Sequence, residues 1–253
     1  GIVPACEEAM DWDAKRKPET DELSPLEDSE CIHENTADFY VRDKHGCKLA
    51  AVFTDGSAHA TRSRWLSFGG WGVFVGRSAR ANACGSLDGN IITSYKAEIK
   101  RILEALRRAR TRICIFCDNQ AAVDITAEIL ANGGDCKISP KDDGAALLWS
   151  QIADVVKVWP PGSHSIQWMP SHLDEEKKKQ LRETWLTNGG CPEWICGNAQ
   201  SDALAENGAQ TNASPLHLRW AQYIATILCQ TVQYMAIHVW ATHKDLLDQI
   251  DSK

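Results

Sequence analysis

Two short apolar runs that each end in an aspartate constrain the fold of this chain more than any other feature. The first is LAAVFTD at 49–55 and the second is ICIFCD at 113–118. Continuous apolar runs of this length are typical of strands that are buried on both faces of a sheet. A charged group directly after such a run is costly to bury unless it meets a cation or serves a site. We therefore expect Asp55 and Asp118 to lie at one edge of a sheet, where ligands of α/β proteins gather.

The segments around these two runs alternate between strand and helix patterns. Further strands are predicted at 69–76, 79–89 and 165–172, and helices at 94–109, 120–134 and 144–159. An antiparallel meander followed by alternating elements predicts a mixed sheet of five strands with helices on both faces. The fold class expected from this order is α/β, with a helical extension at the C-terminal end.

Charge is distributed unevenly along the 253 residues. The net charge of −7 argues, taken alone, against a nucleic-acid-binding protein. Residues 1–39 hold twelve acids and three bases, however, and the rest of the chain carries a net charge of +2. We predict an acidic flexible linker over 1–45, a folded domain over 46–213 and an amphipathic helix over 214–253. The opening Gly1 suggests a piece of a longer protein.

Cysteines and apolar runs bear on the cellular setting. Ten cysteines occur without regular short spacing, and the opening GIVPACEEAM has no secretory pattern. They are expected to be reduced thiols in an intracellular protein, with nucleus and cytoplasm not distinguished. Residues 220–243 lack Asp, Glu, Lys and Arg but include several Gln and His side chains. This favours a buried or partner-facing helix over a membrane span.

Two further acids can join Asp55 and Asp118. Glu98 lies in the first turns of the helix predicted at 94–109, and Asp202 lies in the helix opening GNAQSDALA. A single acid at a strand end is most often a turn former or a helix cap, so the case rests on four acids in this order. Four clustered carboxylates repel one another without a counter-charge, and hard oxygen ligands favour Mg²⁺ or Mn²⁺. The sequence thus predicts a site for two such ions.

Five motifs in this order resemble type 1 ribonuclease H. They are FTDGS (53–57), the AE of YKAEIKRILEAL (95–106), FCDNQAAV (116–123), WMPSH (168–172) and GNAQSDALA (197–205). The likeness covers about residues 48–210, so the domain over 46–213 would be a ribonuclease H catalytic domain. The spread of the last two motifs resembles the ribonuclease H domains of non-LTR retroelement reverse transcriptases, which makes other parts of a retroelement polyprotein possible partners.

The resemblance implies roles for particular residues. Asp55, Glu98, Asp118 and Asp202 match the metal-binding catalytic acids, and His172 matches a histidine that assists proton transfer or product release. Residues that match or adjoin substrate-binding positions are Gly56, Ser57, Thr93, Asn119 and Asn198. Two departures stand out, because Ile91 replaces an arginine of the phosphate grip and thirty residues separate His172 from Asp202. The long separation leaves the reach of His172 open.

A basic segment follows the second motif. Residues 96–112 carry seven Lys and Arg side chains, among them Arg107 and Arg108, against two Glu. Such a run is either a solvated helix face or a surface for the phosphates of an RNA–DNA hybrid. Beside the carboxylates we expect the second, with Arg107 and Arg108 as substrate contacts.

The predicted function is hydrolysis of the RNA strand of an RNA–DNA hybrid, leaving 5′-phosphate and 3′-hydroxyl ends, as the resemblance implies. One alternative is a catalytically silent hybrid-binding or RNA-binding remnant of a retroelement. A second is a DNA-cutting relative, because one fold hosts several chemistries. Cys191 and Cys196 near His172 could suggest zinc, but their spacing is wider than the usual ligand pair and no second pair follows.

Overall fold

The structure is a computed structural model that describes residues 25–59, 66–88, 92–135, 145–211, 213 and 216–251. The chain divides into a larger unit within residues 16–213 and a second unit that contains helix α7 (Leu216–Asp251). Ile91, Ser214 and Pro215 lie outside the described residues, as does the first half of the predicted linker, residues 1–24.

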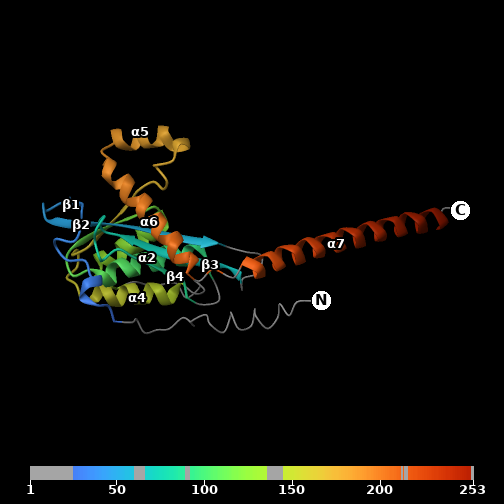
Figure 1. The fold of residues 1–253 in the computed structure, drawn as a ribbon, viewed down its shortest axis with the longest axis horizontal. Helices are drawn as coiled ribbons and strands as arrows, with labels where there is room; N and C mark the ends of the chain where they lie inside the picture. Colours follow the sequence, from blue (N-terminus) through green and yellow to red (C-terminus); the bar gives the residue numbers. More distant parts are fainter. Residues whose placement is uncertain are drawn as a thin grey trace. The chain divides into compact units, whose positions relative to one another are not determined.

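The larger unit is built on one mixed sheet with the strand order β4-β3-β2-β5-β6 (Figure 1). β2 pairs antiparallel with β3, which pairs antiparallel with β4, whereas β2–β5 and β5–β6 are parallel pairs. The strands are β1 (Tyr40–Arg42), β2 (Lys48–His59), β3 (Phe68–Phe74), β4 (Ala83–Ser86), β5 (Ile113–Cys117) and β6 (Ser165–Trp168). The predicted meander plus parallel strands is therefore confirmed, and β1 adds a sixth strand by pairing with the start of β2.

Helices cover both faces of this sheet, as predicted. They are α2 (Ser94–Arg108), α3 (Gln120–Ala131), α4 (Ala146–Lys157), α5 (Lys179–Thr187) and α6 (Pro192–Gln210), with single turns η1 (Asp28–Glu30) and η3 (Glu176–Lys178). Successive side chains of a strand point to opposite faces. Ala50 and Val52 of β2 accordingly join the core formed with α2, α3 and α4, while Ala51 and Phe53 join a smaller core with Trp194 and other side chains. Figure 1 shows α2 and α4 on one side of the sheet and α6 on the other.

The linker prediction does not hold for residues 25–45. Cys31 and Ile32 are buried, and the backbone of Ile32 accepts from Arg110 N–H and donates to Arg108 C=O at the end of α2. β1 then pairs with β2. The many acids of this region concealed a short apolar pair that packs on the domain, so the packed chain begins well before residue 46.

Two predicted element boundaries also shift. The strand predicted at 79–89 is shorter, because Asn82 closes a turn by accepting from the backbone N–H groups of Val75 and Gly76. The helix that carries Asp202 begins at Pro192 instead of Gly197. Proline in the first helical turn lacks only an N–H that would have no partner there, so it is a favoured starting residue. Residues 192–196 are therefore helical as well.

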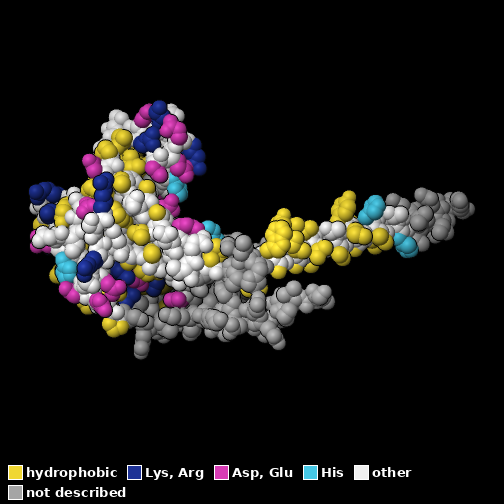
Figure 2. All heavy atoms as spheres, viewed as in Figure 1, with side chains coloured by type: hydrophobic (Ala, Val, Ile, Leu, Met, Phe, Trp, Pro, Cys, Tyr) yellow, Lys and Arg dark blue, Asp and Glu magenta, His cyan; other side chains and the backbone are white. Residues whose placement is uncertain are grey.

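The second unit is the 36-residue helix α7. Its segment Tyr223–Lys244 is long and apolar enough to cross a membrane by length and composition. Figure 2 shows hydrophobic side chains along this helix. Gln230, Gln233, His238 and His243 lie within the segment. The expectation of a buried or partner-facing helix stays a prediction.

A buried histidine makes the stability of the domain depend on pH. His164 is 4% exposed, its Nδ1 accepts from Ile113 N–H at 3.3 Å, and its ring packs against Trp159. Burial, with a smaller contribution from Arg112, lowers the pKa of His164 from 6.5 to about 4. The unfolded chain therefore takes up a proton at this histidine more readily than the folded chain does. The contribution of neutral His164 to the unfolding free energy is complete above about pH 6.5 and is lost as the pH falls toward 4.

Replacing His164 should remove this dependence. Between about pH 7.5 and pH 4.5 the wild type should lose about 2–3 kcal/mol of unfolding free energy more than His164→Gln, at about 1.36 kcal/mol per pKa unit. Glutamine keeps an acceptor for Ile113 N–H, so the fold is retained. Urea unfolding of both proteins at the two pH values measures the difference, and equal losses would contradict the prediction.

Candidate active site

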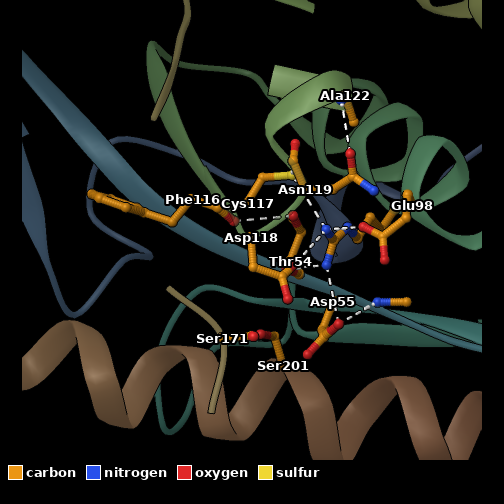
Figure 3. Close-up of polar contacts among 12 residues, drawn as sticks. Thr54, Asp55, Glu98, Phe116, Cys117, Asp118, Asn119, Ala122, Ser171 and Ser201 are labelled. Carbon is orange, nitrogen blue, oxygen red and sulfur yellow. Dashed lines mark hydrogen bonds and ion pairs between the residues drawn. The ribbon is translucent and has the colours of Figure 1, made fainter. Parts of the chain in front are cut away.

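Three carboxylates from separate elements converge at one edge of the sheet. Phe53 of β2 and Phe116 of β5 are partners in the parallel pair, so the residues that follow them, Asp55 and Asp118, reach the same edge. β2 continues to His59 beyond Asp55, paired only with β3, so Asp55 lies where the parallel pairing ends instead of at the strand end. Glu98 comes from the first turns of α2, and Figure 3 shows the three side chains pointing toward one another.

Arg101 lies among these carboxylates and was not predicted to do so. Its side chain has no exposure, and its Nη1 donates to Asp55 Oδ1 at 3.0 Å and to Thr54 C=O at 2.9 Å. Its Nη2 donates to Asp118 Oδ1 at 2.6 Å and forms an ion pair with Glu98 Oε2. One guanidinium group thus contacts all three carboxylates.

The carboxylates are held in a poorly solvated, negatively charged place. Burial raises the pKa of Asp55 to about 6, although Arg101 opposes the shift and Asp118 adds to it. Burial likewise raises the pKa of Glu98 to about 7, against the opposing charge of Arg101. Burial favours the neutral form of a carboxyl group, and a neighbouring carboxylate does the same. One guanidinium therefore does not fully compensate this cluster.

The donor set fits a hard divalent cation. Side-chain ligand atoms of Glu98, Cys117 and Asp118 lie within 4.8 Å of one another, a group that includes one thiol and does not include Asp55. Each of the three carboxylates gives one oxygen to Arg101. Among the described residues, the structure gives no hydrogen bond to Asp55 Oδ2, Glu98 Oε1 or Asp118 Oδ2. Carboxylate oxygens are the ligands that Mg²⁺ and Mn²⁺ prefer, so these residues could hold such an ion.

The fourth acid lies on the opposite side of the site, on α6. Asp202 is about half exposed, and its Oδ2 is 3.9 Å from Nδ1 of His172. Its charge contributes to raising the pKa of Asp55, so it is electrostatically coupled to the cluster. Burial raises the pKa of Asp202 itself, against the charge of His172. The thirty-residue separation thus does not keep His172 from Asp202, because α5 and the start of α6 occupy the intervening chain.

Asn198 lies one helical turn before Asp202. It is 4% exposed, and its side-chain Oδ1 is buried without a hydrogen-bond partner among the described residues. Helical residues four apart share a face. Asn198 therefore offers an unused oxygen on the turn next to Asp202.

The other predicted substrate residues have local contacts that explain their identity. Gly56 N–H donates to Asp55 Oδ1 at 2.6 Å, and a side chain at Gly56 would overlap the backbone of Ala97 in α2. Ser57 donates to Glu206 Oε2 at 2.9 Å. Thr93 and Asn119 cap α2 and α3 by accepting from Lys96 N–H and Ala122 N–H. These contacts leave substrate binding by the four residues a prediction.

Arg107 and Arg108, which the sequence predicts as phosphate contacts, make ion pairs within the domain, which argues against that role for the buried Arg108 and leaves it a prediction for Arg107. Arg108 is 5% exposed, forms an ion pair with Glu104 and lies over the ring of Trp71. Arg107 Nη1 donates to the same buried Glu104 at 2.8 Å. Lys100 also pairs with Glu104. Burial alone would raise the pKa of Glu104, but the charges of Lys100, Arg107 and Arg108 lower it. The basic run of α2 thus neutralises an internal acid at these positions.

Arg108→Ala should therefore change stability and not phosphate binding. Loss of a partner from a buried carboxylate should lower the unfolding free energy by about 1–3 kcal/mol. The dependence of hybrid affinity on salt should stay as in the wild type, whereas a lost phosphate contact would reduce its slope by about 1. Urea unfolding and fluorescence anisotropy measure the two quantities. If Arg108→Ala reduced the salt slope by about 1, Arg108 would contact a phosphate after all. Arg80 is exposed, so Arg80→Ala is the control for the loss of one positive charge.

No protein family model and no curated protein matches the chain. Solved structures that resemble it include the solution structure of the PFV RNase H domain, at 20% identity and TM-score 0.45 over 64% of this chain and 94% of that one. LC9-RNase H1, described as a type 1 RNase H with the type 2 active-site motif, has 17% identity and TM-score 0.42 over 70% and 82%.

A third similar structure is the Prototype Foamy Virus Protease-Reverse Transcriptase, at 18% identity and TM-score 0.44. The likeness covers 68% of this chain but 23% of that one. No residue role or activity follows from these likenesses, and the fold class follows from the sheet order itself.

Proposed function

We propose that the chain is a divalent-metal-dependent nuclease that hydrolyses the RNA strand of RNA–DNA hybrids. The observation that carries the proposal is the convergence of Asp55, Glu98 and Asp118 from β2, α2 and β5. Burying three carboxylates together is costly, and a catalytic metal site is a physical reason for a fold to maintain them. The five motifs of the sequence supply the substrate class.

The four acids divide into two roles in this proposal. Asp55, Glu98 and Asp118 would hold Mg²⁺ or Mn²⁺ through the oxygens that Arg101 leaves free. When bound, such an ion supplies positive charge that stabilises the negative charge developing on the cleaved phosphate. Asp202 and His172 are about half exposed at the rim of the site. Both would position the strand, and Nδ1 of His172 would accept a proton.

Substrate binding in this proposal falls to side chains near the carboxylates. Thr93 is exposed at the start of α2, and the hydroxyl of Ser57 lies on the strand that carries Asp55. Hydroxyl and amide groups that contact phosphates and 2′-hydroxyls bind a hybrid without reading its sequence. The proposal extends to a retroelement reverse transcriptase as the source of the chain, because of the spread of the last two motifs. It extends to an intracellular setting because the cysteines follow no regular spacing.

A second candidate function is favoured by one observation. Arg101 already contacts all three carboxylates, and a guanidinium so placed could stabilise the cluster in a protein that binds hybrids without cutting them. The two candidates differ in a single assay.

That assay incubates the full chain with labelled RNA–DNA hybrid, duplex DNA or duplex RNA, each with Mg²⁺ and with chelator. The proposal predicts cleavage of the hybrid alone, on its RNA strand, and only with metal. Hybrid binding without cleavage would support the silent module and contradict the proposed activity. Preferential cutting of duplex DNA would place the chain with DNA-cutting nucleases instead.

A further inference from the structure

The position of Arg101 bears on how many cations the site can take. The residue stands three positions after Glu98 on α2 and is fully buried. Its two terminal nitrogens contact one oxygen of each of Asp55, Glu98 and Asp118. Because arginine stays protonated in proteins, this is a permanent positive charge inside the cluster.

Asp55 limits the number most directly. A carboxylate that bridges two ions about 3.5–4 Å apart most simply gives one oxygen to each of them. Asp55 Oδ1 already accepts from Arg101 Nη1 at 3.0 Å and from Gly56 N–H at 2.6 Å. Only Oδ2 is left without a hydrogen bond from the described residues, so an ion bound through Oδ1 would have to displace the guanidinium.

The guanidinium is anchored too firmly for easy displacement. Nη1 also donates to Thr54 C=O at 2.9 Å, and Nη2 lies 3.2 Å from Cys117 Sγ. Both partners belong to the strand segments that carry Asp55 and Asp118. Removing the guanidinium from this place would leave buried acceptors unpaired, which is unfavourable for each group.

We propose that Arg101 takes the place of one divalent cation, so that the site binds a single ion where two are expected from the sequence. This inference rests on the proposed function, since it concerns the metal site of that nuclease. Arg101 is a positioning residue in this account: it holds the three carboxylates together and turns their free oxygens to one ion.

The test counts the manganese ions bound by the full chain. Mn²⁺ is titrated into the wild type, Arg101→Met and Asp118→Asn, with free ion measured by electron paramagnetic resonance. Manganese ions that the wild type binds and Asp118→Asn does not bind are assigned to the site formed by Asp55, Glu98 and Asp118. The wild type should bind one such ion, with the spectrum of an isolated Mn²⁺. Arg101→Met should bind two, with the spectrum of a magnetically coupled pair.

The remaining outcomes separate this inference from the proposed function. A magnetically coupled pair of ions in the wild type would overturn the role of Arg101, and so would equal numbers of bound ions in the wild type and Arg101→Met. Neither result would contradict the proposed nuclease activity. No Asp118-dependent ion in the wild type would overturn both. Should Arg101→Met not fold, Arg101→Gln, whose amide can still donate to one carboxylate, replaces it with the same expected pair.

Discussion

Asp118→Asn should lower Mg²⁺-dependent cleavage of an RNA–DNA hybrid by more than about a hundredfold, since a catalytic cation supplies several kcal/mol and each 1.36 kcal/mol is tenfold in rate. The substitution keeps the size of the side chain but removes its negative charge. It also replaces a carboxylate that accepts from Arg101 at 2.6 Å with a neutral amide. Initial rates on a labelled hybrid measure the effect.

The matched control is Asp124→Asn, the same chemical change six residues further along the chain. Asp124 is exposed on α3 and accepts from Gln120, away from the three carboxylates. Its rate should equal that of the wild type. Because the amide oxygen introduced by Asp118→Asn can still accept from Arg101, the fold should persist, as circular dichroism can verify. Substantial cleavage by folded Asp118→Asn would refute the role of Asp118 in holding the metal.

Phe53→Ala should cost about 3–5 kcal/mol of unfolding free energy, the range for removing a fully buried aromatic ring. Phe53 has no exposure, stacks on Phe116 at 5.0 Å between ring centroids and meets Phe39 edge-on at 6.2 Å. Gly197 of α6 packs directly against its ring. Because Phe53 lies two residues before Asp55, the same cavity should loosen the position of that carboxylate.

Urea unfolding measures this loss, with Phe39→Ala as the control. Phe39 contacts the same ring but is only partly buried, so its truncation should cost clearly less. A cost below about 1 kcal/mol for Phe53→Ala would mean that the core collapses onto the vacated space or does not depend on this ring.

The strands and three acids were predictable because they depend on periodicity and topology. A buried apolar run that ends in an acid indicates a strand and places the charge near the end of its parallel pairing, and parallel neighbours bring such residues together. Asp55 and Asp118 needed no further information. The start of α6 was missed because its first turns, Pro192 to Cys196, lack a regular apolar period.

The interior charges were not predictable in the same way. Arg101 and Arg108 belong to a run of basic residues that indicates a solvated helix face or a phosphate surface. Their positions, three after Glu98 and four after Glu104, gave a signal of pairing on the same helix face. What the sequence could not give is which face the domain buries around them, because that depends on how closely α2 approaches β2 and β3.

For the segment before residue 46, the sequence predicted a flexible linker where part of the chain is packed. Net charge described the region correctly as acidic, but Cys31 and Ile32 form a pair of apolar residues too short to produce a period. Their burial depends on a backbone pairing with the end of α2 that no local pattern reveals.

The most direct test of the metal site is the anomalous scattering of manganese in crystals of the full chain. The account predicts a manganese peak within coordination distance of the carboxylate oxygens of Asp55, Glu98 and Asp118. A map with manganese bound elsewhere on the protein and none among these three side chains would contradict it.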